Sequence, residues 1–101
     1  MAVIEITKAN FETEVMQSEQ PVLLDFWASW CGPCQMLSPV VDQIGEERED
    51  IKVGKINVDM DQELAMKFKV ASIPTLVVMK DGEESERSVG VITKEEILAL
   101  L

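Results

Sequence analysis

The sequence predicts an α/β domain, because an apolar strand, an amphipathic helix and a second strand follow one another with short connections. The first strand covers residues 22–28, where apolar side chains are nearly continuous, as in a central strand covered on both faces. The helix is indicated by apolar residues at helical spacing, which are Leu37, Val40, Val41 and Ile44. With a second strand at 51–58, the three elements form a βαβ unit, whose strands are parallel and whose crossover is right-handed.

Length and composition indicate one globular domain, residues 1–101, which we expect to be monomeric. The chain is 47% hydrophobic and 28% charged, and its apolar stretches are too short to span a bilayer. Its net charge of −10 argues against binding to nucleic acid, which needs a basic face. The N-terminal residues lack the basic region of a signal peptide, so we expect a cytoplasmic protein.

The N-terminal elements are a short strand at 3–6 and a helix with Asn10 as a plausible N-cap. The helix of the βαβ unit is expected to begin at Pro33 or Cys34 and to end between 45 and 49. Pro39 lies inside it and removes a backbone donor, so we expect a kink there, with Ser38 helping to satisfy the freed backbone.

The C-terminal part contains a short helix, a hairpin and a final helix. Asp59 or Asp61 is the expected cap of the short helix. Strands at 75–79 and 84–89 flank an Asp-Gly turn, which is a strong hairpin signal. The segment 93–96, Thr-Lys-Glu-Glu, is a capping box for the last helix.

The two cysteines of the chain, Cys31 and Cys34, lie in the segment Trp-Cys-Gly-Pro-Cys at the junction of the first central strand and its helix. On a helical turn, residues i and i+3 are about 5–6 Å apart at Cβ, so a small contraction allows a disulfide. Backbone N–H groups and the helix dipole would stabilise a thiolate on Cys31, and we expect a lowered thiol pKa.

Three interpretations of this cysteine pair are possible. A zinc site needs about four ligands, and the chain has no histidine and no third cysteine, so a site closed within one chain is nearly excluded. A structural disulfide across so short a loop would constrain little of the unfolded chain. A redox-active dithiol is favoured.

Asp25 is unusual because it interrupts the apolar strand that leads to the cysteines. Burial would raise the pKa of its carboxyl group by desolvation. We hypothesise that Asp25 exchanges a proton with Cys34, through water, during disulfide exchange. The alternative is a strand residue that faces solvent.

Taken together, several motifs resemble the thioredoxin family, in its bacterial type: residues 25–28 (Asp-Phe-Trp-Ala), 30–34, 73–75 (Ile-Pro-Thr), 80–82 (Lys-Asp-Gly) and 89–90 (Val-Gly). The resemblance runs from the first strand to the last helix. It implies a mixed five-stranded sheet flanked by four helices, and a cytoplasmic protein-disulfide reductase that carries electrons for redox homeostasis. It also implies recharging by a flavin- and NADPH-dependent thioredoxin reductase, disulfide-containing target proteins, and no bound cofactor, since the dithiol carries the electrons.

We expect Cys31 to attack a target disulfide because it meets solvent first, and Cys34 to resolve the mixed disulfide. The resemblance places Lys55 close to Asp25; a lysine whose stem is buried and whose amino group is in water is the alternative. Sequence alone favours a trans bond before Pro74, whereas the resemblance implies a cis bond that turns the Ile73 backbone toward the dithiol. The expected substrate-binding residues around the sulfurs are Trp30, Gly32, Pro33, Ile73, Pro74, Gly90 and Val91.

The chain departs from the family pattern at Gln35, where a basic residue is common, and at Met79, where an aromatic is common. Two other functions stay open. A disulfide oxidase or isomerase usually needs export and often has histidine between its cysteines, so Gly32 and Pro33 favour a reductase. A binding subunit that uses the same surface with an idle dithiol is the third possibility.

Overall fold

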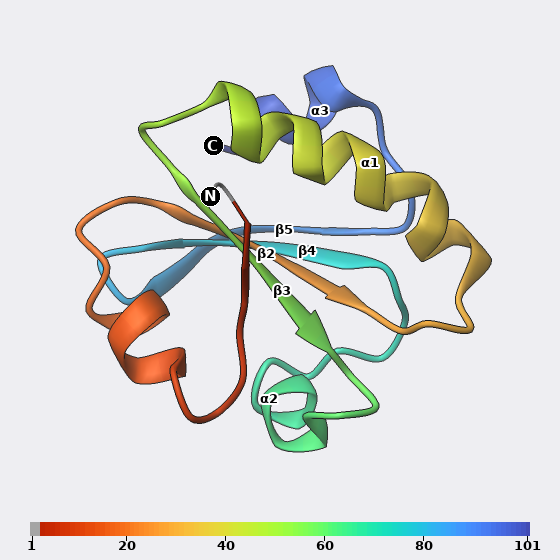
Figure 1. Cartoon of the computed structure of the whole chain (residues 1–101), viewed down its shortest axis with the longest axis horizontal. Helices are drawn as coiled ribbons and strands as arrows, with labels where there is room; N and C mark the ends of the chain where they lie inside the picture. Colours follow the sequence, from red (N-terminus) through yellow and green to blue (C-terminus); the bar gives the residue numbers. More distant parts are fainter. Residues whose placement is uncertain (1–2) are drawn as a thin grey trace.

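The structure, a computed structural model, describes residues 3–101 as a five-stranded mixed sheet with helices on both faces (Figure 1). Residues 1 and 2 of the expected domain lie outside this part. The elements are β1 Val3–Glu5, η1 Glu12–Met16, β2 Val22–Trp27, α1 Gly32–Glu47, β3 Lys52–Asn57, α2 Gln62–Lys67, β4 Thr75–Lys80, β5 Glu83–Val89 and α3 Lys94–Leu98.

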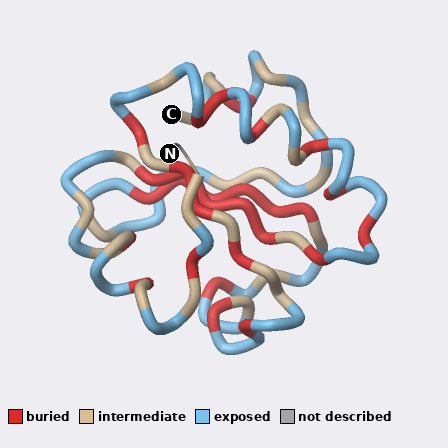
Figure 2. Tube along the Cα trace, viewed as in Figure 1, coloured by how far each residue is buried: buried red, intermediate tan, exposed pale blue. Residues whose placement is uncertain are grey.

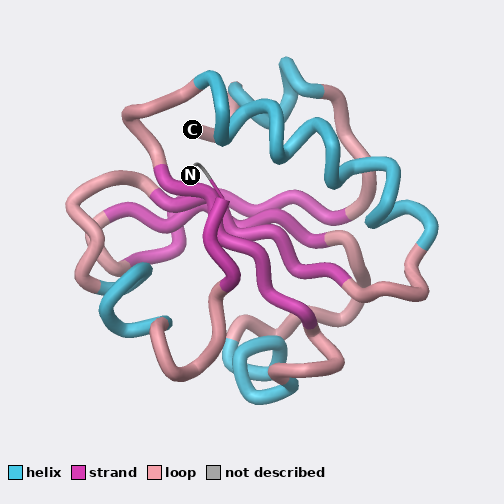
Figure 3. Tube along the Cα trace, viewed as in Figure 1, coloured by secondary structure: helices cyan, strands magenta, loops and turns pink. Residues whose placement is uncertain are grey.

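The sheet has the strand order β1-β3-β2-β4-β5 (Figure 3). Both β1 and β2 pair with β3 in parallel, whereas β4 is antiparallel to β2 and to β5. The predicted βαβ unit is therefore confirmed as β2, α1 and β3. The mixed five-stranded sheet with four helices, which the family resemblance implied, is confirmed as well.

Two apolar layers fill the space between the sheet and its helices. One lies under α1 and α3 and contains Leu23, Val53 and Leu76 from the strands. The other lies under η1 and α2 and contains Leu24 and Phe26. Figure 2 shows the buried central strands between these layers. Because strand residues alternate between faces, the odd-numbered positions of β2, including 25, face α1.

The predicted ends of several elements are close to those observed. Asp61, one of the two expected caps, accepts from the Leu64 N–H at 3.3 Å. The capping box at residues 93–96 is present. In the hairpin turn, Asp81 and Gly82 both have positive φ, as a type I′ turn requires.

Two local expectations were wrong. Asn10 is not a helix cap: its side chain accepts from the Thr7 N–H and donates to the Glu5 carbonyl, which closes a turn before η1. Helix α1 begins at Gly32, one residue before the predicted start, because Cys31 is its N-cap. Within residues 3–101, no helix combines the length and the apolar character needed to cross a membrane.

Candidate active site

The dithiol occupies the N-terminus of α1 and forms a disulfide between Cys31 and Cys34. Their Cα atoms are 5.2 Å apart, which lies inside the range for a disulfide. The Cys34 N–H donates to Cys31 Sγ at 3.2 Å, and the first turn of α1 holds no acidic residue. The positive end of the helix dipole therefore favours negative charge on Cys31, and no carboxylate in the first turn of α1 opposes this effect.

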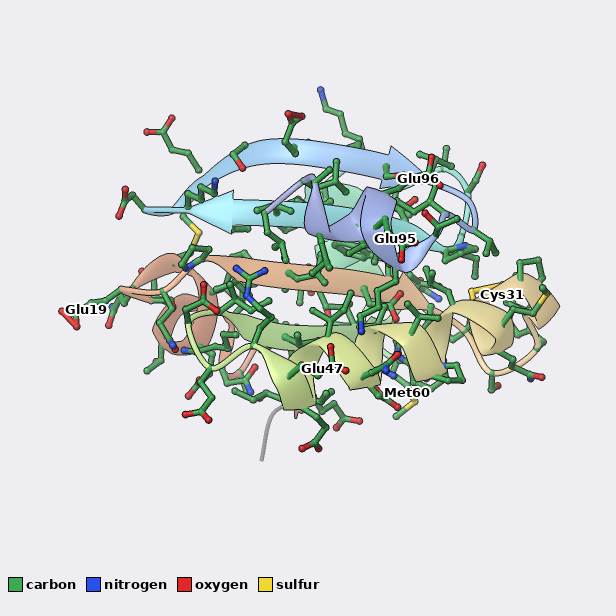
Figure 4. All side chains as sticks on the ribbon, turned by 90° about the horizontal axis from the view of Figure 1, so that it is seen from above. Glu19, Cys31, Glu47, Met60, Glu95 and Glu96 are labelled. Atoms are coloured by element: carbon green, nitrogen blue, oxygen red, sulfur yellow. A yellow bond between two sulfur atoms is a disulfide. The ribbon has the colours of Figure 1, made fainter. Side chains whose placement is uncertain are left out.

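The expected difference in exposure between the two cysteines was wrong. Cys31 is 4% exposed and Cys34 is 3% exposed. The reason is that both pack with Ala28 in a small apolar cluster, against which Trp27, Val58 and Ile73 also pack. This cluster is separate from the two main layers, and Figure 4 shows Cys31 at the outer end of α1. Gly32 and Pro33, which lie between the two cysteines, are exposed, so the buried sulfurs lie close to the protein surface.

Asp25 is buried in the middle of β2, so the solvent-facing alternative is wrong. It is 1% exposed, and its Oδ1 atom has no hydrogen-bond partner within the described chain. Desolvation raises the pKa of the Asp25 carboxyl to about 6; the positive charge of Lys55 opposes this shift, and the negative charge of Asp42 adds to it. Asp25 is therefore a stronger base than an ordinary aspartate.

Lys55 lies directly opposite Asp25 in the parallel pair of β2 and β3, as the family resemblance led us to expect. Its amino group nevertheless bonds to α1: it lies 2.7 Å from Asp42 Oδ1 and donates to Ser38 Oγ. The Lys55 side chain is 16% exposed, which does not fit a lysine whose amino group is simply in water. Ser38 Oγ therefore accepts from Lys55, a partner that the sequence analysis did not expect for it.

A cavity of about 180 Å³ lies beside Cys34 and is lined by Trp27, Cys34, Gln35, Ser38 and Lys55. A water molecule takes about 30 Å³ in the liquid, so the cavity has room for several. The cavity extends from Cys34 to Lys55, the register partner of Asp25, and Asp25 itself is not among its lining residues.

The Ile73–Pro74 peptide bond is cis, as the resemblance implied and against the expectation from sequence alone. The Ile73 carbonyl oxygen lies 3.8 Å from Cys31 Sγ. The Gly90 N–H donates to the Pro74 carbonyl at 2.8 Å, and Gly90 has a φ of 95°, which favours glycine. The structure thus places Ile73 beside the dithiol and Gly90 beside Pro74.

Trp30 is 69% exposed, and Val91 is 46% exposed. The Trp30 indole N–H donates to Asp59 Oδ2 at 2.8 Å, so Asp59 orients the ring and does not cap α2. Sequence analysis missed this role, as it missed Asp42. The signal available for Asp42 was its spacing: Cys34, Ser38 and Asp42 are four residues apart and share one face of a helix.

Comparison with known proteins gives the family. The family model described as Thioredoxin matches residues 2–101. The thioredoxin of Mycobacterium tuberculosis (strain H37Rv) is 49% identical over 98 residues, which cover 96% of this chain and 84% of that protein. The thioredoxin of Pyropia yezoensis is 47% identical over 102 residues, covering 100% and 95%. A bifunctional thioredoxin reductase/thioredoxin of Mycobacterium leprae is 45% identical over 96 residues, covering 94% of this chain and 21% of that protein.

Proposed function

Because this chain belongs to the thioredoxin family and is a protein-disulfide oxidoreductase, we propose that it works as a general reductase of protein disulfides through Cys31 and Cys34. The observation that carries this proposal is a cysteine pair that closes into a disulfide at the N-terminus of α1. The reductant is the dithiol itself, so the reaction needs no bound cofactor.

In the proposed reaction the thiolate of Cys31 attacks one sulfur of a target disulfide. A mixed disulfide forms, and the other target sulfur leaves as a thiolate that takes up a proton. The Cys34 thiol then loses its proton and attacks Cys31 Sγ, which releases the second target thiol. The target gains two electrons from the dithiol and two protons, which balance the proton lost when Cys31 ionises and the proton that Cys34 releases, and the Cys31–Cys34 disulfide remains.

The assignment of Cys31 as the attacking residue now rests on its N-cap position, since exposed area does not separate the two cysteines. Asp25 is the proposed acceptor of the Cys34 proton, through water in the neighbouring cavity. Lys55 is assigned an indirect part, through its electrostatic effect on Asp25.

The proposed substrate-binding surface consists of the residues around the dithiol. It comprises Trp30, Gly32, Pro33, Ile73, Pro74, Gly90 and Val91. The exposed apolar groups of Trp30 and Val91 would contact the target, and the Ile73 backbone would pair with an extended segment beside the disulfide. Such a surface has no shaped side-chain pocket, which suits a broad range of targets.

We further propose that a flavin- and NADPH-dependent thioredoxin reductase returns electrons to the disulfide, in the cytoplasm. The name of the Mycobacterium leprae relative, which joins a reductase and a thioredoxin in one chain, supports such a partnership. Residues 1–101 are proposed to act as one monomeric domain, without nucleic acid or membrane as a partner.

The decisive experiment is reduction of a disulfide-bonded test protein with dithiothreitol as the electron donor. The wild-type chain should accelerate the reaction, and Cys31→Ser should abolish the acceleration. Equal rates for the two proteins would leave only a binding role for this surface.

The order of the two cysteines is tested by trapping. Cys34→Ser should accumulate a covalent complex with the target that dithiothreitol releases, because Cys31 attacks and nothing resolves the product. If Cys31→Ser accumulates such complexes and Cys34→Ser does not, the assigned roles are reversed.

A further inference from the structure

One face of α1 links the resolving cysteine to a polar pair that has no assigned role. Ser38 and Asp42 follow Cys34 at successive intervals of four residues, so the three side chains lie along one stripe of the helix. Ser38 is partly buried, and the Asp42 side chain is 52% exposed. Both bind the same group, the amino group of Lys55 on β3.

The position of Lys55 makes this contact informative. Its Cα is the register partner of Asp25, so the two side chains leave the sheet on the same face, toward α1. A lysine so placed has a buried carboxylate as its natural partner. Its amino group instead bonds to α1, and Asp25 Oδ1 has no hydrogen-bond partner in the described chain.

We propose that Ser38 and Asp42 are positioning residues that hold the Lys55 amino group on α1 and so keep it from forming an ion pair with Asp25. This inference rests on the proposed role of Asp25 as the proton acceptor for Cys34. A carboxylate paired with a cation holds its proton weakly and makes a poor base near neutral pH. Holding Lys55 away preserves the basicity of Asp25.

The charged groups around Asp25 are few, which keeps the interpretation simple. β3 brings Lys55, and α1 brings Asp42 together with the disulfide-bonded Cys34. β4 places Leu76 opposite Asp25, and α3 contributes Ile97 to the same layer; neither carries a charge. The positive charge of Lys55 lowers the pKa of Asp25, and the negative charge of Asp42 raises it. Removing the Asp42 charge takes away the raising effect and also frees Lys55 to approach Asp25. Both changes lower the Asp25 pKa.

The test is an NMR titration of the Asp25 carboxyl carbon in the oxidised protein, for wild type, Ser38→Ala and Asp42→Asn. Both variants should lower the Asp25 pKa, Asp42→Asn by about one unit, as expected when a cation comes within ~4–6 Å of a carboxylate. Ser38→Ala changes no charge and makes the cavity lining less polar, which by itself would raise the pKa, so a lowered Asp25 pKa reports the release of Lys55. Glu46→Gln, an exposed neutralisation on the same helix, is the matched control and should leave the pKa unchanged.

Asp42 can act on the Asp25 pKa by its own charge and by holding Lys55, and a Lys55→Gln background separates these two effects. If Asp42 acts by holding Lys55, the shift caused by Asp42→Asn should fall by more than half once Lys55 is gone. An undiminished shift would show that Asp42 acts only by its own charge, and it would overturn the proposal. An unchanged Asp25 pKa in Ser38→Ala would overturn the part assigned to Ser38.

Two further measurements keep the outcome unambiguous. Asp42→Glu restores the charge and should restore the wild-type pKa, and circular dichroism checks that each variant is folded. The titration uses the oxidised protein and no electron transfer. Failure of the proposed catalytic role, seen as normal disulfide resolution by Asp25→Ala, is therefore distinguishable from failure of the positioning role.

Discussion

Asp25 and Lys55 are register partners in adjacent parallel strands, yet in the described chain the Lys55 amino group bonds to Asp42 at 2.7 Å and forms no ion pair with Asp25. The buried carboxyl thus lacks an ion-pair partner, and its Oδ1 atom has no hydrogen-bond partner in that part of the chain. Desolvation dominates its titration for this reason, and the pKa rises to about 6.

The first prediction concerns stability and pH. The Asp25 pKa is about 6 in the folded protein, whereas an ordinary, solvated aspartate has a pKa of 3.8, so between these values the folded state binds more protons than the unfolded state. Stability should therefore fall as pH rises through this window, by a total of about 3 kcal/mol above pH 6. Asp25→Asn lacks this titration, so its advantage over wild type should grow by about 2.5 kcal/mol from pH 4 to pH 8.

Urea unfolding of the two oxidised proteins at both pH values measures the effect. Any pH-independent consequence of the asparagine side chain cancels in the comparison. A stability difference that is the same at pH 4 and pH 8 would contradict the raised pKa.

The second prediction concerns the resolving step. Asp25→Ala should slow the attack of Cys34 on a preformed mixed disulfide near neutral pH, by about 10²-fold, because positioned general bases typically contribute that much or more. The rate is measured by release of a chromophoric thiol bound to Cys31, from pH 5 to pH 9. Unchanged rates over this whole range would remove Asp25 from the mechanism.

The third prediction concerns the proposed substrate-binding surface. Trp30 is 69% exposed and is held by its hydrogen bond to Asp59. Burying this ring against a target should stabilise the complex, so Trp30→Ala should raise the KM for a protein disulfide by about tenfold, equivalent to about 1.4 kcal/mol.

The control for Trp30→Ala is reduction of its Cys31–Cys34 disulfide by dithiothreitol. This small thiol does not bind the proposed substrate-binding surface, so the rate of this reaction should not change. Trp30→Phe keeps an aromatic ring and should recover most of the KM. A Trp30→Ala variant with a normal KM would place the target elsewhere.

The fourth prediction separates stability from chemistry. The Thr93 hydroxyl accepts from the Glu96 N–H at 3.1 Å, and the Glu96 carboxylate accepts from the Thr93 N–H at 2.9 Å. Thr93→Ala removes one half of this capping box and should cost about 1 kcal/mol of stability. Thr93→Ser keeps the hydroxyl and should cost little. At temperatures below their unfolding transitions, both variants should reduce disulfides at the wild-type rate. If Thr93→Ala reduced disulfides more slowly than wild type, α3 would influence the dithiol.

Features that depend on neighbouring residues were predictable. Leu37, Val41 and Ile44 lie on one stripe and are all buried under α1, because the helical period alone places them together. The cap at Asp61 and the capping box at Thr93 involve groups only three residues apart. The spacing of Cys31 and Cys34 likewise brings the sulfurs within bonding distance on one turn.

The failures have two different causes. The cysteines are buried because Trp27, Val58 and Ile73, from three separate parts of the chain, pack against their cluster. The failure at Asn10 is local: its side chain bonds to Thr7 and Glu5 and closes a turn instead of capping the helix.

Residue order is enough to specify a βαβ core, a dithiol able to close at a helix start, and a carboxylate in a strand too apolar to solvate it. Each of these depends on local spacing and on the cost of burying charge. Which partner Lys55 takes depends on the packed fold, because Asp25, Ser38 and Asp42 all lie within its reach once β3 packs beneath α1. The competition among them is settled by distances across the fold, which no spacing along the chain records.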